Sequence, residues 1–178
     1  MSIRTISSRT VYRNRWMTVR EDKIERPDGS PGIYSVVEKP DFALIIPLED
    51  DHLYLVEQYR VPVGQRFLEF PQGAWEDHPS AAPVELARGE LREETGLRAA
   101  RLEALGHLFI AYGISNQGFH VFLATGLTQG DASPDKEEQD LMVRRMPVSE
   151  FEQRVRGGEI KDAATLSAWA LFTMKARP

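Results

Sequence analysis

The stretch "GELREETGL", Gly89–Leu97, decides how this 178-residue chain is interpreted. It places Glu90, Glu93 and Glu94 at the end of a segment whose apolar residues recur with helical spacing. Residues at i, i+3 and i+4 share one helical face, so the three carboxylates face the same region of space. A helix C-terminus favours cations, and like charges four residues apart cost about 0.2–0.5 kcal/mol. Repulsion among these carboxylates, and between them and the helix C-terminus, therefore destabilises the helix unless another group offsets it.

A bound divalent cation would remove this cost. Carboxylate oxygens without a neighbouring thiol or imidazole suit a hard ion such as Mg²⁺ or Mn²⁺. Such an ion also binds phosphate oxygens and lowers the pKa of a bound water. A glutamate-rich helix face is more often simply solvated, and Arg88 and Arg92 are placed to screen it. Spacing alone leaves both interpretations open.

The rest of the chain predicts a mixed α+β fold. The motif helix is expected to begin near Pro83, with Ser80 or Asp77 as its cap, and to end at Gly96. The continuous apolar run "FALIIPL" predicts a strand buried on both faces. Further strands are expected at residues 16–24, 32–38, 53–61, 66–70, 102–110, 119–127 and 141–148, with residues 19–38 forming a hairpin. Further helices are expected at 149–158 and 162–175, the last capped by Asp162. Strands first and last, with helices between and after them, favour a mixed sheet.

Composition narrows the class of protein. Apolar residues make up 42% of the chain and charged residues 28%, as in an ordinary globular domain. A net charge of -5 argues against non-specific nucleic-acid binding, which relies on a basic surface. The absence of cysteine excludes disulfides and thiolate metal sites and fits a reducing compartment. Without an apolar run of membrane-spanning length or a signal-peptide pattern, we expect a cytoplasmic protein with no membrane contact.

The complete string "GELREETGL" closely resembles the signature of the Nudix hydrolases, in which "RE-apolar-x-EE-x-G-apolar" follows a glycine and a glutamate in a loop–helix–loop. The resemblance implies the Nudix fold, a mixed β-sheet sandwiched between helices. It also implies Mg²⁺, with Mn²⁺ as a possible substitute. Glu90 and Glu94 would be the main ligands, and Glu93 a further ligand or a base that orients water.

The loop before the helix departs from the family pattern. Gly89 replaces the usual arginine, and Gly73 precedes Glu90 by seventeen positions instead of fifteen. The isolated glutamate of the signature falls on Pro79 or Ala81. In the family, that glutamate and that arginine commonly brace the loop against the helix. Loss of both is tolerated better than loss of one, because loss of one leaves the other charge without a partner. We therefore expect a variant loop, braced instead by the side chains at positions 75 and 76, a tryptophan and a glutamate.

Further stretches resemble the ADP-ribose and nucleotide-sugar pyrophosphatase branch of the family. These are "LVEQYR", "LEFPQG" and "GEIKDAATLSAWAL", so the resemblance extends from about residue 33 to residue 171. It implies that Arg60 contacts the diphosphate or the terminal sugar and that Glu69 lies near substrate or metal. The backbone carbonyl of Gln72 would ligate the metal. The late acidic loop "PDKEEQD" would supply Glu138 or Glu137 as a ligand or base, although a solvated loop is an equal alternative for each.

Residues 1–40 resemble the extra β element that this branch uses for dimer exchange, ahead of a hydrolase domain at 41–178. A homodimer of two-fold symmetry is also the commonest assembly of soluble proteins. The resemblance implies that Trp16 or Arg26 reaches the nucleotide across the dimer.

The sequence therefore predicts hydrolysis of a nucleoside diphosphate sugar, with ADP-ribose the leading substrate. The products would be a nucleoside monophosphate and a sugar phosphate. The alternative is a non-catalytic Nudix-fold sensor that binds a nucleotide and regulates a partner, because a fold alone does not set function.

Overall fold

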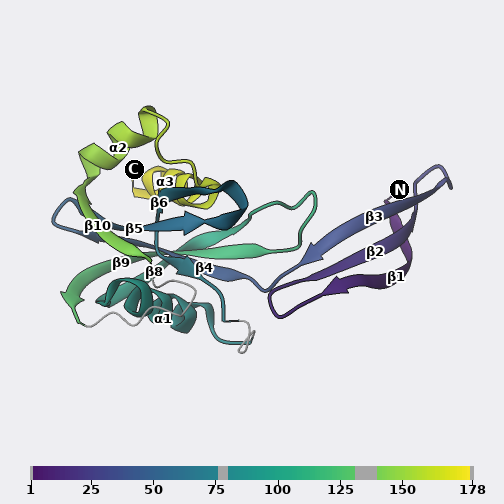
Figure 1. Cartoon of the computed structure of the whole chain (residues 1–178), viewed down its shortest axis with the longest axis horizontal. Coiled ribbons are helices and arrows are strands. Elements are labelled where there is room, and N and C mark those ends of the chain that lie inside the picture. Colours follow the sequence, from purple (N-terminus) through teal and green to yellow (C-terminus); the bar gives the residue numbers. More distant parts are fainter. Residues whose placement is uncertain (1, 76–79, 131–139, 177–178) are drawn as a thin grey trace.

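The computed structural model describes residues 2–75, 80–130 and 140–176. The chain begins with a three-stranded antiparallel sheet that extends away from the rest of the molecule (Figure 1). Its strands are β1 (Arg4–Arg13), β2 (Thr18–Glu25) and β3 (Pro31–Glu38). A hairpin from Val19 to Glu38 was predicted, and the structure contains it as β2 and β3. The additional strand β1 lies within the predicted N-terminal β element of residues 1–40, although no separate strand was predicted there.

The second sheet is the larger one and has seven strands in the described residues. They are β4 (Phe42–Glu49), β5 (His52–Arg60), β6 (Gln65–Glu69), β7 (Gln72–Gly73), β8 (Leu97–Phe109), β9 (Gly118–Gln129) and β10 (Met142–Pro147). The order is β10-β5-β4-β9-β8, with β6 paired to β5 and β7 to β4. Since β4 and β9 run parallel while the other pairs are antiparallel, the sheet is mixed, as predicted.

Helices cover both faces of the larger sheet (Figure 1). Helix α1 (Pro83–Thr95) lies on one face, while α2 (Val148–Arg156) and α3 (Ala163–Ala176) lie on the other. A short 3₁₀ turn, η1 (Val61–Val63), links β5 to β6. The arrangement confirms the predicted α+β class with a mixed sheet between helices. No helix in the described residues has the length and apolar character needed to cross a lipid bilayer.

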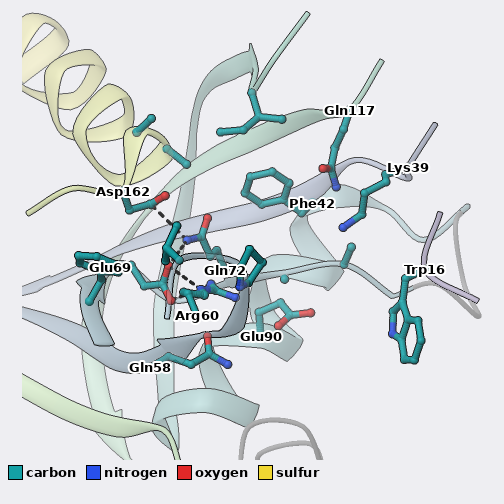
Figure 2. A pocket seen from close by; sticks show the side chains of 18 of the residues that line it. Trp16, Lys39, Phe42, Gln58, Arg60, Glu69, Gln72, Glu90, Gln117 and Asp162 are labelled. Atoms are coloured by element: carbon teal, nitrogen blue, oxygen red, sulfur yellow. Dashed lines mark hydrogen bonds and ion pairs between the residues drawn. The ribbon is translucent and has the colours of Figure 1, made fainter. Parts of the chain in front are cut away.

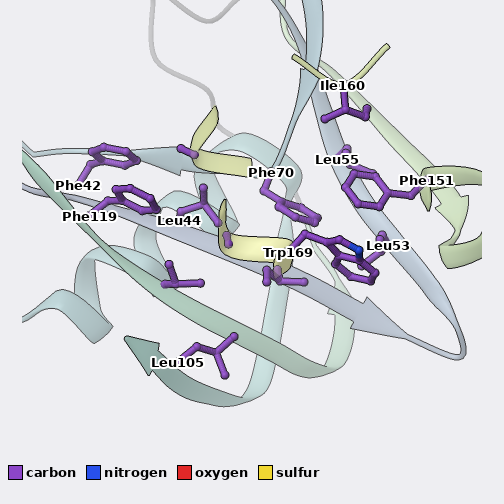
Figure 3. Packing of buried hydrophobic residues seen from close by; sticks show 14 of the residues in the cluster. Phe42, Leu44, Leu53, Leu55, Phe70, Leu105, Phe119, Phe151, Ile160 and Trp169 are labelled. Carbon is purple, nitrogen blue, oxygen red and sulfur yellow. The ribbon is translucent and has the colours of Figure 1, made fainter. Parts of the chain in front are cut away.

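Strand β4 divides the hydrophobic core into two layers. Ala43 and Ile45 pack with Leu91 and other residues of α1, whereas Leu44 and Ile46 belong to the layer under α2 and α3. Figure 3 shows this second layer, where aromatic rings of α2, α3 and the strand ends meet. Alternate side chains of a strand point to opposite faces, so an uninterrupted apolar run is needed when both faces are covered.

The ends of the helices show how local sequence sets their limits. Helix α1 ends at Gly96, whose φ of 73° lies in the left-handed region that favours glycine. Helix α3 is capped as predicted, because Asp162 Oδ2 accepts the backbone N–H of Thr165 at 2.8 Å. The predicted cap of α1 was wrong for Ser80. The N-cap is Ala82, which makes no side-chain cap bond, and Asp77 lies outside the described residues.

Candidate active site

A cavity of about 840 Å³ opens between the N-terminal segment, the larger sheet, α1 and the start of α3. Figure 2 shows charged side chains from several of these elements pointing into it. Its lining includes acidic and basic groups side by side, which suits a ligand carrying both phosphate and neutral polar groups. The basic residues are Arg15, Lys39, Arg60 and Lys161, and the acidic residues are Glu69, Glu90, Glu93 and Asp162.

The motif helix brings its glutamates against strand β7. At Gly73, an added Cβ would lie 2.3 Å from Glu90 Oε2, so the glycine lets the Glu90 carboxylate approach the backbone closely. The backbone N–H of Gln72 donates to Glu94 Oε2 at 3.1 Å. Glu90 and Glu94 are buried, with 6% and 2% of their surface exposed. Two carboxylates of one helix therefore meet the same short turn of backbone.

The third glutamate of the motif is more open. Glu93 is half-buried and lines the cavity, and its Oε1 lies 3.5 Å from Arg92 Nη2. The donors that this part of the site offers are carboxylate oxygens together with nearby backbone carbonyls. That donor chemistry fits a hard divalent cation such as Mg²⁺, which prefers oxygen ligands.

The missing arginine of the motif is explained by Trp75. An added Cβ at Gly89 would lie 2.1 Å from Cζ2 of the Trp75 ring. The indole therefore occupies the space that a side chain at position 89 would need. Trp75, one of the two side chains predicted to brace the variant loop, packs against the helix at Gly89. Glu76, the second predicted brace, lies outside the described residues.

A charged network lies beside the motif glutamates in the same cavity (Figure 2). Arg60 Nη2 lies 2.7 Å from Glu69 Oε1, and Arg60 Nε donates to Glu69 Oε2 at 3.3 Å. Gln72 Nε2 donates to Glu69 Oε2 at 3.0 Å and to Asp162 Oδ2 at 3.2 Å. The network thus joins β5, β6, β7 and the start of α3 into one polar surface.

Burial and charge act in opposite directions within this network. Burial raises the pKa of Glu69, and the charge of Arg60 offsets only part of that effect. Burial by itself would lower the pKa of Arg60, but the negative charges of Glu69, Glu94 and Asp162 outweigh it and raise that pKa. Arg60 therefore stays cationic inside the site. A fixed cation there can receive a phosphate group.

Comparison with known proteins identifies the family. The NUDIX domain matches residues 39–169, and the nucleoside diphosphate sugar hydrolase N-terminal domain matches residues 3–37. The chain belongs to the NUDIX domain family. The predicted assignment to the Nudix hydrolases is therefore confirmed, and with it the enzyme class.

Individual relatives of this Nudix hydrolase agree. An ADP-ribose pyrophosphatase of Mycobacterium tuberculosis is 34% identical over 180 residues, which cover 98% of this chain and 86% of that protein. A methanol dehydrogenase activator of Bacillus methanolicus is 25% identical and covers 93% of this chain and 89% of its own length. The crystal structure of an ADP compounds hydrolase superposes with a TM-score of 0.86 at 25% identity, covering 98% of this chain and 94% of that one.

The other residues predicted for the Nudix site have different locations. Trp16 lines the cavity of its own chain (Figure 2), whereas we had expected it to arrive from a partner across a dimer. Arg26 lies in the turn between β2 and β3, where its guanidinium donates to the carbonyl of Pro31 at 2.5 Å, and it does not line the cavity. Glu137 and Glu138 lie outside the described residues.

Sequence reasoning missed several residues of the cavity. Asp162 was predicted only as a helix cap, yet the same oxygen also accepts from Gln72. Lys39, Gln58 and Lys161 line the cavity and were not predicted. For Lys161 and Asp162 a signal was present, since both belong to the quoted stretch "GEIKDAATLSAWAL". Gln58 likewise belongs to the quoted stretch "LVEQYR". Lys39 carries no local signal, because only the packing of distant segments brings it to the cavity.

Proposed function

We propose that this Nudix hydrolase cleaves the diphosphate bond of a nucleoside diphosphate sugar in a Mg²⁺-dependent reaction, with ADP-ribose as the leading substrate. The observation that carries the proposal is the meeting of Glu90 and Glu94 with the Gln72–Gly73 turn, on the wall of a cavity that also contains Arg60. The named M. tuberculosis relative supports the choice of substrate. The products are a nucleoside monophosphate and a sugar phosphate.

The metal-binding part of the proposal assigns Glu90, Glu93, Glu94 and the carbonyl of Gln72 as ligands, with Glu138 or Glu137 as the late carboxylate. When bound, Mg²⁺, or Mn²⁺ in its place, neutralises phosphate charge and lowers the pKa of a bound water. Glu93, Glu94 and the late carboxylate are the candidates for holding the proton of the attacking water. The burial of Glu94 and its backbone hydrogen bond fix its orientation, which favours catalysis by limiting reorganisation.

The remaining side chains bind the substrate in this proposal. Arg60 faces the diphosphate, and Glu69 holds Arg60 in position through two close contacts. Trp16 is 48% exposed at the cavity and offers an aromatic face to the nucleotide base. Arg26 reaches a substrate only as a contribution from a second subunit, since it does not line the cavity of its own chain.

A homodimer built through the N-terminal sheet belongs to the same proposal. All ten residues of β1 are exposed, and so are apolar side chains such as Ile33 and Tyr34 of β3. The large exposed apolar side chains of residues 3–34 are Ile3, Ile6, Val11, Tyr12, Trp16, Ile33 and Tyr34, and such a concentration favours an interaction site. A second copy of the chain would cover this surface.

A panel of substrates tests the proposed activity. The purified protein is assayed with Mg²⁺ against ADP-ribose, ADP-glucose, GDP-mannose and a nucleoside triphosphate, with release of the nucleoside monophosphate as the readout. We expect turnover of the diphosphate sugars, fastest for ADP-ribose, and loss of turnover with excess EDTA. Turnover of the triphosphate alone would contradict the proposed substrate class.

The same panel separates the enzyme from the alternative, a nucleotide sensor that regulates a partner. The relative named as an activator of methanol dehydrogenase supports keeping this second candidate. A sensor would show thermal stabilisation by ADP-ribose without turnover of any member of the panel. Multiple turnover in the absence of any partner would support the hydrolase and reject the pure sensor.

A further inference from the structure

Three metal-binding side chains lie together outside the cavity described above. Asp41 stands in the linker between β3 and β4, His107 on β8 and His120 on β9. Their ligand atoms all lie within 4.8 Å of one another, the one such group of three found among the described residues. None of the three lines the cavity, so the group is separate from the motif glutamates.

The fold brings the group together through strand pairing. His107 and His120 are direct cross-strand partners in the antiparallel pair β8 and β9. Strand β4 runs parallel to β9 with Phe42 opposite Phe119, which puts Asp41, one residue earlier, beside the two histidines. The register places the two histidines opposite each other and Asp41 level with Gly118, and the hydrogen bond from Gly118 N–H to Asp41 Oδ1 holds the aspartate beside them.

Contacts around the group hold the donors in place before any ion arrives. Asp41 Oδ1 accepts the backbone N–H of Gly118 at 2.8 Å, which leaves Oδ2 facing the imidazoles. Oδ2 lies 2.8 Å from His107 Nε2 and 3.8 Å from His120 Nε2. At Gly118 an added Cβ would lie 2.2 Å from His107 Nε2, so a glycine there leaves room for the ring.

The distances match the requirements of a small tetrahedral ion. Zinc ligands about 2.0–2.1 Å from the metal lie about 3.4 Å apart, and the two measured oxygen–nitrogen distances bracket that value. Two imidazole nitrogens with one carboxylate oxygen suit Zn²⁺ and its neighbours in the transition series, whereas Mg²⁺ prefers oxygen donors alone. Side-chain exposures of 42% for Asp41, 34% for His107 and 33% for His120 leave a path for the ion.

We propose that Asp41, His107 and His120 form a second metal site, specific for a zinc-type dication, bound by Oδ2 of the aspartate and Nε2 of each histidine. Three protein ligands leave the fourth tetrahedral position to water or to an external group. The site is distinct from the oxygen-rich site of the motif helix in both donor chemistry and place.

A metal at this position would attach the linker between β3 and β4 more firmly to the β8–β9 hairpin. The linker is already attached there, since Asn116 Oδ1 accepts the N–H of Lys39 and Gln117 Nε2 donates to the carbonyl of Pro40. Lys39, Phe42 and Gln117 all line the catalytic cavity (Figure 2). The ion would therefore stabilise one wall of the cavity and the attachment of the N-terminal sheet.

Metal titration of the full-length protein tests the proposal. The protein is stripped with EDTA, exchanged into metal-free buffer and titrated with Zn²⁺ and, separately, with Co²⁺ as a spectroscopic probe. We expect one high-affinity Zn²⁺ equivalent, a raised melting temperature and the intense visible absorption of four-coordinate Co²⁺. Weak absorption typical of six-coordinate Co²⁺, or no binding, would overturn the site.

Variants locate the bound ion. Loss of a ligand's hydrogen-bonding partner alone weakens metal binding 10–100-fold, so His120→Gln and Asp41→Asn are each expected to weaken Zn²⁺ binding by about 100-fold or more. His52→Gln, at the first residue of β5, and Glu94→Gln should leave this equivalent in place. Unchanged binding in both ligand variants, or its loss in Glu94→Gln, would assign the ion elsewhere. If one ligand variant does not fold, the other variant and the Co²⁺ spectrum of the unaltered protein still decide the question.

Discussion

The two sheets of this molecule differ in how deeply their side chains are buried. In the seven-stranded sheet, Ala43, Leu44, Ile45 and Ile46 of β4 are completely buried between helices. In the three-stranded sheet, every residue of β1 is exposed, and Ile24 of β2 is the one buried apolar side chain that the structure describes there. Full burial of a Leu or Ile side chain contributes about 1.5–3 kcal/mol, so the larger sheet gains much more stability from burial than the smaller sheet does.

The difference supports the proposal that the smaller sheet makes its main contacts with a second copy of the chain. It nevertheless reaches the cavity within one chain, because Trp16, in the turn between β1 and β2, lines that cavity. We expect chemistry to depend on the larger sheet and its helices, and assembly to depend on the smaller sheet. The predictions below test this division, from the largest expected effect to the smallest.

The largest effect is expected from Glu94→Gln, which keeps the shape of the side chain and removes its charge. Loss of one group that stabilises charge in a transition state commonly lowers kcat by about 10²–10³-fold, and we expect a loss at least as large here. The measurement is steady-state hydrolysis of ADP-ribose with Mg²⁺, with circular dichroism to confirm folding.

The matched control is Glu85→Gln, on the exposed first turn of the same helix. It should hydrolyse ADP-ribose at the rate of the unaltered protein. Full activity in Glu94→Gln would show that Glu94 is not needed for hydrolysis. It would also contradict the expectation that chemistry depends on the larger sheet and its helices.

Assembly should fail in Ile33→Glu, which places a charge on the exposed surface of β3. A buried charge without a partner costs about 3 kcal/mol or more, which corresponds to a roughly hundredfold rise in the dissociation constant of a dimer. Analytical ultracentrifugation over a range of concentrations measures the change. Met174→Glu on α3, whose side chain is 78% exposed, is the control and should leave the dimer intact. A dimer that survives Ile33→Glu at low concentration would show that β3 lies outside the interface.

Gly89→Ala should lower the free energy of unfolding, because the added methyl group would clash with the Trp75 ring that packs on α1. Overpacking costs about 1–3 kcal/mol, while the better helix propensity of alanine returns about 0.5–1 kcal/mol. We expect a net loss of about 1–2 kcal/mol, measured by urea denaturation. In a Trp75→Ala background the same change should be neutral or stabilising, because the clash is gone. A gain in stability in the unaltered background would contradict the packing described here.

The smallest effect concerns ion pairs on the two sheets. Arg144 and Arg66 hold the pKa of Glu57 below its usual value, with Arg144 Nε 2.8 Å from Glu57 Oε2. A lowered folded-state pKa adds stability above the ordinary pKa of glutamate, and that stability is lost as the pH falls through the folded value. Glu57→Gln should therefore cost less than about 1 kcal/mol at pH 7 and nothing at pH 2.

Glu25→Gln provides the comparison on the smaller sheet. Its partner Arg4 has 71% of its side chain exposed and Glu25 has 40%, so solvent screens the pair. We expect no measurable change in thermal stability at either pH. A larger effect for Glu25 than for Glu57 would show that the smaller sheet is stabilised mainly by its ion pairs.

Much of the architecture and part of the site could be predicted from the sequence, because both depend on local patterns. The apolar run of β4 predicts a central strand, and the spacing of Glu90, Glu93 and Glu94 puts three acids on one helical face. Gly96 ends α1 and Asp162 caps α3 through contacts within a few residues. The spacing of apolar residues, every two residues in strands and every 3.6 in helices, is visible in the sequence, so it can be recognised without the tertiary structure.

Only the tertiary structure decides which distant segments meet. Trp75 covers Gly89, Gln72 joins Asp162 across 90 residues, and Asp41 meets His107 across 66. These contacts depend on strand register, and a shift of one residue would turn every side chain of a strand to the opposite face. The sequence by itself therefore determined the family and the acidic helix. The fold determined what surrounds that helix, because long-range pairing has no local signature.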